Sequence, residues 1–402
     1  MRATLTGMAS PGFSRNLLRP DTDGAEHRVT YIELFFDLVF VFAVTQISHL
    51  LLAHPGPEEF LHTLVLTAVV WWVWIYTTWA FTWLNPERGP VRAMLIVMML
   101  LGLLMASAIP EAFGDKDLLF AGALAAMQVG RSAFTLLALA RQRPELGLNF
   151  LRISLWNAFA AAFWIAGALV PDALRPWIWL LALLVDYGAP YLLYWVPFLG
   201  RSDITTWNVA GGHMAERVSL FLIIVLGESI IVSGTSFSEG PLDWTNVIAF
   251  LSSFLGTVLL WLLYFSHSER GGSDYIVNAA DPGPIARTAY TYVPALMVLG
   301  VVLAAVADGL VLADPLEAGS LWTAGLVCGS SAVYVLGNAL FRRAAGGRWL
   351  AGHFLGILAF GLLTAASPLV PALVLAWAAN AVLLLVVVGD EVAWRRAQPS
   401  HG

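Results

Sequence analysis

The chain has 402 residues, of which 59% are hydrophobic and only 12% are charged, and its mean hydropathy is +0.75. Soluble domains average roughly 45–50% apolar and about 25% charged residues, so a soluble core could not hide this much apolar surface. The formal net charge of −6 combines 21 basic with 27 acidic residues, a mixture that predicts no nucleic-acid partner. Composition therefore predicts an all-α polytopic membrane protein with the lipid bilayer as its partner.

The first 27 residues contain arginines and prolines but no continuous apolar segment. This pattern argues against a cleavable signal peptide, so we expect the first membrane span to act as its own insertion signal. The single cysteine, Cys328, lies in an apolar segment and excludes an intrachain disulfide.

Apolar segments separated by Pro, Gly and charged residues predict about twelve transmembrane helices. In chain order they lie at 29–52, 60–83, 91–110, 117–140, 148–170, 176–198, 214–236, 244–266, 285–311, 319–341, 350–369 and 371–389. Only residues 367–371 divide the last two, which leaves a re-entrant pair as an alternative there.

Basic residues fall on one side of this arrangement. The side of the N-terminus, with the adjoining helix ends, holds 18 of the 21, whereas the opposite side holds Lys116 and Arg175 and one arginine, Arg131, lies inside a helix. The positive-inside rule then predicts that the tails at 1–28 and 392–402 are cytoplasmic.

The second half of the sequence echoes the first at an offset of about 190–200 residues. For example, Leu169-Val170-Pro171 precedes Asp186, and Leu369-Val370-Pro371 precedes Asp390. An internal repeat of six helices each is predicted, with both halves in the same orientation because six is even. The halves would be residues 29–210 and 211–391.

Ionisable residues in and beside the predicted helices are the candidate ion or substrate pathway, because each costs about 2.5–3.5 kcal/mol to insert. They are Glu33, Asp37, Arg131, Asp186, Glu216, Arg217 and Glu228. Asp308 lies nearer a helix end and is not included in this pathway.

Spacing gives the first expectations about these charges. Glu33 and Asp37 are four residues apart and share one helical face, whereas Arg217 and Glu228 are roughly 16 Å apart along one helix, too far to pair. Arg131 is the one cation in the middle of a predicted helix, so we expect it to pair with Glu228 or Asp37.

Asp186 is followed by Tyr187-Gly188-Ala189-Pro190, which should break its helix beside a cavity. The sequence contains no His or Cys with metal-ligand spacing, no phosphate-binding loop, no dinucleotide-binding glycine pattern and no nucleophile elbow. We therefore expect no cofactor, leave a metal open, and find no motif that favours an enzyme.

Four segments carry a family resemblance: Arg28 to Ala43, Met105 to Pro110, Asp186-Tyr187 with Pro190, and His213 through Ser229. Together they resemble the bacterial low temperature requirement A family, and the similarity runs from about residue 28 to the last helices. The resemblance implies a multi-pass plasma-membrane protein linked by name to growth in the cold, without a settled activity.

Two classes of function follow from these charges. In the first, a transporter of ions or small solutes, proton- or cation-coupled, uses Asp37, Glu228, Asp186 and Arg131 along a path between the halves; a cation channel is a variant of it. In the second, a receptor, an assembly factor or an enzyme on a lipid-linked substrate keeps the same charges as a structural ion-pair network. A solvated cavity beside the acids favours transport, and a dry ion pair favours the second class.

Overall fold

The computed structural model describes residues 17–19, 29–140, 142–202, 211–279, 282–318 and 320–397, and in these ranges the chain is almost entirely helical. The predicted N-terminal tail lies outside the described residues except for 17–19. The first part of the chain forms α1 (Tyr31–Ala53), α2 (Pro57–Ala80), α3 (Gly89–Ala108), α4 (Asp117–Leu139), α5 (Pro144–Leu169) and α6 (Arg175–Gly188). The second part forms α7 (Gly211–Glu239), α8 (Trp244–Leu263), α9 (Glu269–Val277), α10 (Pro282–Ile285), α11 (Val293–Ala313), α12 (Leu321–Ala344), α13 (Ala351–Ala366) and α14 (Ala372–Ala397).

Two π-helical turns join short helices to long ones. Tyr264–Ser268 makes α8 and α9 one continuous helix, and Ala286–Tyr292 does the same for α10 and α11. Pro294 lies two residues after the end of the second turn, and a proline has no N–H for the regular hydrogen-bond ladder, which accounts for the widened turn before it. Counted in this way, eleven helices of the described residues are long and apolar enough to cross a membrane.

The predicted sixth helix differs from the others. It ends at Gly188 rather than at residue 198, so its 14 residues span only about 21 Å, less than the roughly 30 Å of a bilayer core. The predicted break after Asp186 is confirmed, and the predicted end of this helix is wrong. Pro190 cannot continue a helix, and Leu193, Tyr194 and Phe198 then adopt positive φ angles.

Side-chain chemistry explains where several helices begin. Thr30 and Glu33 form a reciprocal capping box at the start of α1, which satisfies backbone donors that have no partner inside the helix. Proline occupies the first turn of α2, α3, α5 and α6, where its missing N–H removes no helical hydrogen bond.

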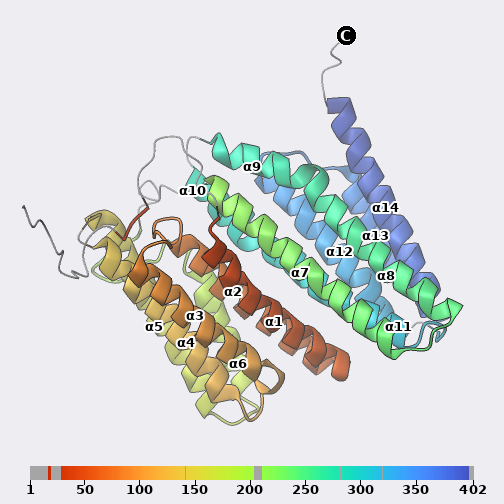
Figure 1. Ribbon diagram of the computed structural model, residues 1–402, viewed down its shortest axis with the longest axis horizontal. Coiled ribbons are helices and arrows are strands. Elements are labelled where there is room, and N and C mark those ends of the chain that lie inside the picture. The colour runs from red at the N-terminus through yellow and green to blue at the C-terminus, as the bar shows by residue number, and fades with distance from the viewer. Residues whose placement is uncertain are drawn as a thin grey trace, which may run out of the picture.

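α1, α7 and α11 lie in the middle of the molecule, with α3 to α6 on one flank and α8 and α12 to α14 on the other (Figure 1). α1 packs against α2, α3, α7 and α11, so the first and seventh membrane helices are in contact near the centre of the molecule. The arrangement places the charged residues of α1 and α7 between the two flanks.

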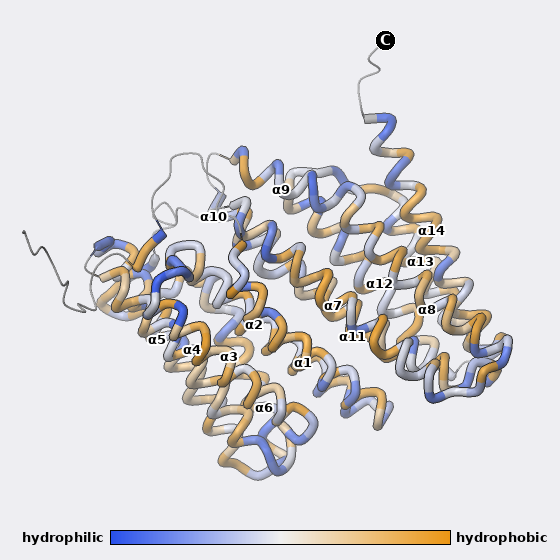
Figure 2. Tube along the Cα trace, viewed as in Figure 1, coloured by the Kyte–Doolittle hydropathy of each residue, from blue (hydrophilic) through white to orange (hydrophobic). Residues whose placement is uncertain are grey.

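The outer surface is apolar along the middle of the helices, and hydrophilic residues gather at their ends (Figure 2). Leucines such as Leu137, Leu184 and Leu385 are exposed on this surface, which suits contact with lipid rather than water. The fold is that of a polytopic membrane protein, as composition predicts.

Candidate functional site

Glu33 is the centre of a buried polar cluster at the N-terminal ends of α1 and α7. Its Oε1 lies 3.2 Å from Nη2 of Arg19 and 2.8 Å from Nε2 of His213. Its Oε2 accepts hydrogen bonds from the Thr30 amide at 2.9 Å and the Thr30 hydroxyl at 2.8 Å. Both carboxylate oxygens are thus satisfied, and Glu33 holds the segment before α1 against the start of α7.

Arg19 lies before the membrane helices and also donates from Nε to the Phe81 carbonyl at 2.8 Å. Burial lowers the pKa of Arg19, and the neighbouring Glu33 carboxylate opposes that change. The guanidinium joins the end of α2 to α1.

Asp37 forms the second pair across the same interface, one helical turn deeper. Its Oδ1 lies 2.7 Å from Nη2 of Arg217 and accepts a hydrogen bond of 2.7 Å from the Trp74 indole. The exposed fractions of the Asp37 and Arg217 side chains are 0% and 2%. Asp37 is paired with Arg217, so the expected pair between Arg131 and Asp37 is wrong.

The sequence contains a pattern that predicts this pairing, and it becomes visible only when two helices are compared. Glu33 and Asp37 are four residues apart on α1, and His213 and Arg217 are four residues apart on α7. The two helices run side by side in the same direction (Figure 1), so equal spacing makes two matching contacts. A search for complementary charges at the same spacing would have found the pair.

Glu216 does not join this cluster. Its side chain is exposed, and its Oε2 accepts a hydrogen bond from the Val29 amide at 3.1 Å. It lies at the rim of the α1–α7 contact.

Glu228 lies further along the interface of α1 and α7 and has a different environment. Only 1% of its surface is exposed, and its Oε2 accepts a hydrogen bond of 2.5 Å from the Thr45 hydroxyl of α1. Within the described ranges Oε1 has no hydrogen-bond partner, and neither has the hydroxyl of the neighbouring Ser229. Glu228 pairs with no described cation, which confirms its separation from Arg217 and makes the expected pair with Arg131 wrong.

Arg131 points into the first flank instead. Its Nη1 donates to the Val73 carbonyl at 3.2 Å and to the Thr77 hydroxyl at 3.3 Å, both on α2, and its guanidinium lies 5.3 Å from the centre of the Tyr76 ring. Arg131 therefore faces a side of α2 other than the one on which Trp74 contacts Asp37. Because Arg131 lies on that other side of α2, it reaches neither Asp37 nor Glu228.

Asp186 is held by uncharged donors from two helices. Its Oδ2 accepts hydrogen bonds from Gln128 of α4 at 3.1 Å and from the Trp164 indole of α5 at 3.0 Å. Gln128 lies three residues before Arg131, yet the described residues include no ion pair between Asp186 and Arg131.

Asp308 of α11, which is not among the predicted pathway residues, lines a small polar cavity between α11 and the second flank. Its volume is about 40 Å³, and its lining includes hydroxyl or amide groups from α8, α12 and α14. These groups are Ser252, Thr257, Ser330, Ser331 and Asn380. The residues next to Asp308 in the sequence are apolar or glycine, so nothing local signals the hydroxyls that the fold brings to it.

A metal centre of the usual kind is not formed by the residues that the structure describes, since no three His, Cys, Asp or Glu side chains come together there. The described part of the chain thus offers two types of acid: Glu33 and Asp37 with cationic partners, and Asp186, Glu228 and Asp308 without them. Chemically, the second type can take up a proton or bind a cation.

Fold and buried charges together define a multi-pass membrane protein. The family described as bacterial low temperature requirement A protein (LtrA) matches residues 28–388, so the chain belongs to the LtrA family. It is similar to the uncharacterized protein RA0937 of Rhizobium meliloti (strain 1021), with 37% identity over 400 residues, covering 98% of this chain and 96% of the relative. No solved structure matches the chain.

Proposed function

We propose that this protein transports an ion or small solute across the bacterial plasma membrane, coupled to protons or cations that bind to intramembrane carboxylates. The observation that carries the proposal is Glu228, a buried acid between the two flanks without a described cationic partner. A carboxylate in such a place is stable only if it is protonated or holds a cation. Alternation between those two states is the chemistry that a coupled carrier needs.

The surroundings of Glu228 support reversible binding. Thr45 supplies one hydroxyl, the Ser229 hydroxyl has no described partner, and Oε1 of Glu228 is unoccupied by any described donor. A proton or a dehydrated alkali cation would find oxygen ligands here without breaking an existing ion pair.

Asp308 supports the same proposal from the neighbouring helix. A side chain at Gly309 would lie 3.0 Å from Leu52 of α1 and 3.3 Å from Val232 of α7. Val232 is one turn beyond Glu228, so the two acids occupy one layer of the membrane. The central helices α7 and α11 therefore each contribute a carboxylate without a described cationic partner at that depth.

A non-transporting role is favoured by one specific observation, the contacts of Glu33 and Asp37. These acids are paired with Arg19, His213 and Arg217, and buried ion pairs of this kind can serve packing alone. We assign these two acids to the joint between α1 and α7, and Glu228 and Asp308 to binding.

The proposal includes an internal repeat of two six-helix halves. In support, the last helix of each half carries a buried aspartate, Asp186 or Asp390, that contacts the fourth and fifth helices of its half. The partners are Gln128 and Trp164 in the first half, and Arg342 at 3.0 Å and His353 at 3.6 Å in the second. A repeat of this type provides two bodies that can rock about a shared site.

Transport is tested with the full chain in proteoliposomes that contain a pH-sensitive dye. Imposed Na⁺, K⁺ or proton gradients should produce a flux that Glu228→Gln abolishes, because an amide keeps the size and polarity but cannot release a proton. Glu239→Gln is the matched control, since Glu239 is an exposed residue at the end of the same helix, and it should transport like the parent. Equal flux in the parent and in Glu228→Gln would refute the role of Glu228.

The family is named for a requirement at low temperature. We propose that loss of the protein impairs growth at low temperature. A deletion strain should therefore be compared with strains that carry the parent or Glu228→Gln, at low and at ordinary growth temperature.

A further inference from the structure

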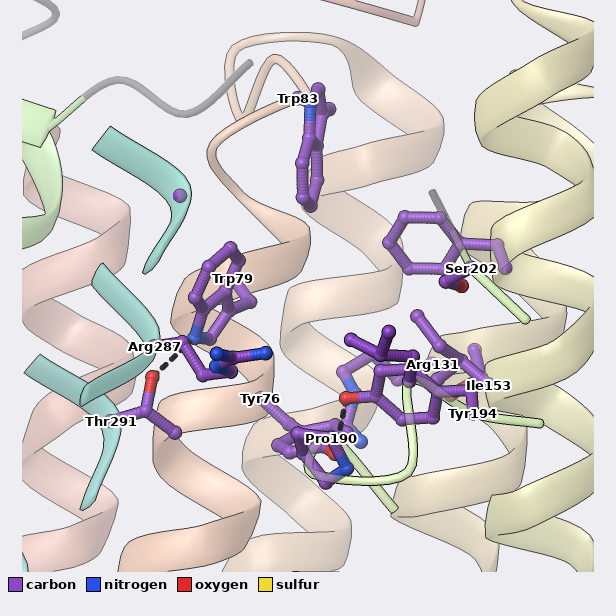
Figure 3. A pocket seen from close by; sticks show the side chains of 14 residues that line it. Tyr76, Trp79, Trp83, Arg131, Ile153, Pro190, Tyr194, Ser202, Arg287 and Thr291 are labelled. Atoms are coloured by element: carbon purple, nitrogen blue, oxygen red, sulfur yellow. Dashed lines mark hydrogen bonds between the residues drawn. The ribbon is translucent and has the colours of Figure 1, made fainter. Parts of the chain in front are cut away.

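A second cavity lies at the ends of the first-flank helices, away from Glu228. It is bounded by α2, α4, α5, the segment after α6 and the start of the helix that contains α11, and its volume is about 60 Å³. That is several times the roughly 10–15 Å³ that one water molecule requires. Figure 3 shows Arg131, Arg287, Tyr76 and Tyr194 gathered around it.

Two guanidinium groups line this cavity, and its described lining contains no carboxylate. Arg131 is 2% exposed, and only its Nη1 has hydrogen-bond partners among the described residues, which leaves Nε and Nη2 to the cavity. Arg287 points its guanidinium into the same space (Figure 3). Among the described residues that line the cavity, these two guanidinium groups are the only charged side chains.

Polar groups at the cavity point to a ligand as well. Ser202 is 4% exposed and its hydroxyl has no described partner, so it is a buried donor directed at the cavity. The hydroxyls of Tyr76 and Tyr194, which also line the cavity, lie 2.6 Å apart.

The remaining wall of the cavity is apolar and aromatic. Trp79 and Trp83 from the end of α2 line it together with Phe150 and Ile153 of α5, and Figure 3 shows the two indole rings above the arginines. A ligand with a charged group and a hydrocarbon part matches this division of the walls.

We propose that this cavity binds an oxyanion, a phosphate or carboxylate group, between Arg131 and Arg287. Guanidinium groups bind these planar or tetrahedral anions through paired, charge-assisted hydrogen bonds. An anion would also offset the charge of Arg131, which is costly at membrane depth without a close acidic partner. The oxyanion comes either from a free inorganic ion or from the headgroup of an amphiphile whose hydrocarbon part contacts the tryptophans.

The test uses the purified full chain in nanodiscs of uncharged lipid and measures binding by isothermal titration calorimetry. The probes are inorganic phosphate, dodecyl phosphate and, as an uncharged match, dodecanol. Dodecyl phosphate should bind saturably, and Arg131→Gln and Arg287→Gln should each weaken that binding at least tenfold. Arg343→Gln, which removes an exposed arginine of α12, should leave it unchanged.

The outcomes separate the two sources of the anion. Binding of inorganic phosphate that both arginine variants weaken identifies a free ion as the ligand, and binding of dodecyl phosphate alone identifies an amphiphile. Equal binding of dodecanol, or parental affinity in Arg287→Gln, overturns the proposal. Arg287 is only partly buried, so its substitution should not prevent folding. Arg287→Gln therefore tests the proposal even where Arg131→Gln fails to fold. Glu228→Gln should keep full binding, which separates this site from transport.

Discussion

The contact between α1 and α7 depends on two buried acids of α1 that lie one helical turn apart. Each acid pairs with a basic residue of α7. Glu33 meets His213 and Asp37 meets Arg217, and the Trp74 ring lies against the Arg217 guanidinium, 5.6 Å from its centre. Removing one partner of such a pair leaves an uncompensated buried charge, whereas removing both leaves neutral groups. Substitutions of Asp37 and Arg217 therefore test directly whether this pair stabilises the fold.

Asp37→Asn and Arg217→Gln should each lower the free energy of unfolding by about 3–5 kcal/mol. The double variant should recover much of that loss, which a double-mutant cycle of unfolding midpoints in detergent would measure. The control is Asp314→Asn, because Asp314 is exposed after the end of α11. If the two single changes add without coupling, the pair does not hold α1 to α7.

The helix pair α11 and α12 shows how small residues set distances between elements. A side chain at Gly300 would lie 2.8 Å from the Tyr334 Cβ and 2.9 Å from its backbone nitrogen, and one at Gly337 would lie 2.8 Å from Met297. Contacts this short are repulsive, so the glycines permit an approach that alanine would prevent. Asp308 lies on the same α11, and its distance from the hydroxyls of α12 depends on this approach.

Gly300→Ala should therefore destabilise the protein by about 1–3 kcal/mol, the usual result of overpacking. Gly329→Ala on α12 is the matched control, since nothing lies within 4 Å of the added methyl group, and it should leave the unfolding midpoint unchanged or raised. Thermal unfolding of both variants in the same detergent makes the comparison. A parental midpoint for Gly300→Ala would show that α11 and α12 can separate freely.

For the whole molecule, the distribution of basic residues predicts that both chain ends lie in the cytoplasm. Alkaline phosphatase, which is active only after export, should be inactive when fused after residue 402 and active when inserted at residues 240–243, between α7 and α8. Green fluorescent protein fusions at the same two sites should give the reverse pattern. Phosphatase activity at the C-terminus would overturn the orientation.

Membrane class and the approximate ends of most helices follow from the sequence alone. These are local properties, because a run of about 20 apolar residues must satisfy its backbone hydrogen bonds as a helix in lipid wherever it packs. The break after Asp186 is local for the same reason, since Pro190 acts within its own segment. The charged candidates Glu33, Asp37 and Glu228 also stand out locally, as polar residues in apolar runs.

Only the tertiary structure decided which of these charges meet. Arg131 lies in the first flank and Asp37 contacts Arg217, because the rotation of α2 and α4 about their axes is fixed by packing between helices distant in the sequence. For the same reason, the hydroxyls around Asp308 and the two arginines of the anion cavity come from separate helices. Apolar periodicity cannot supply that rotation when lipid and protein interior are equally apolar, so the partners of each buried charge became known only from the fold.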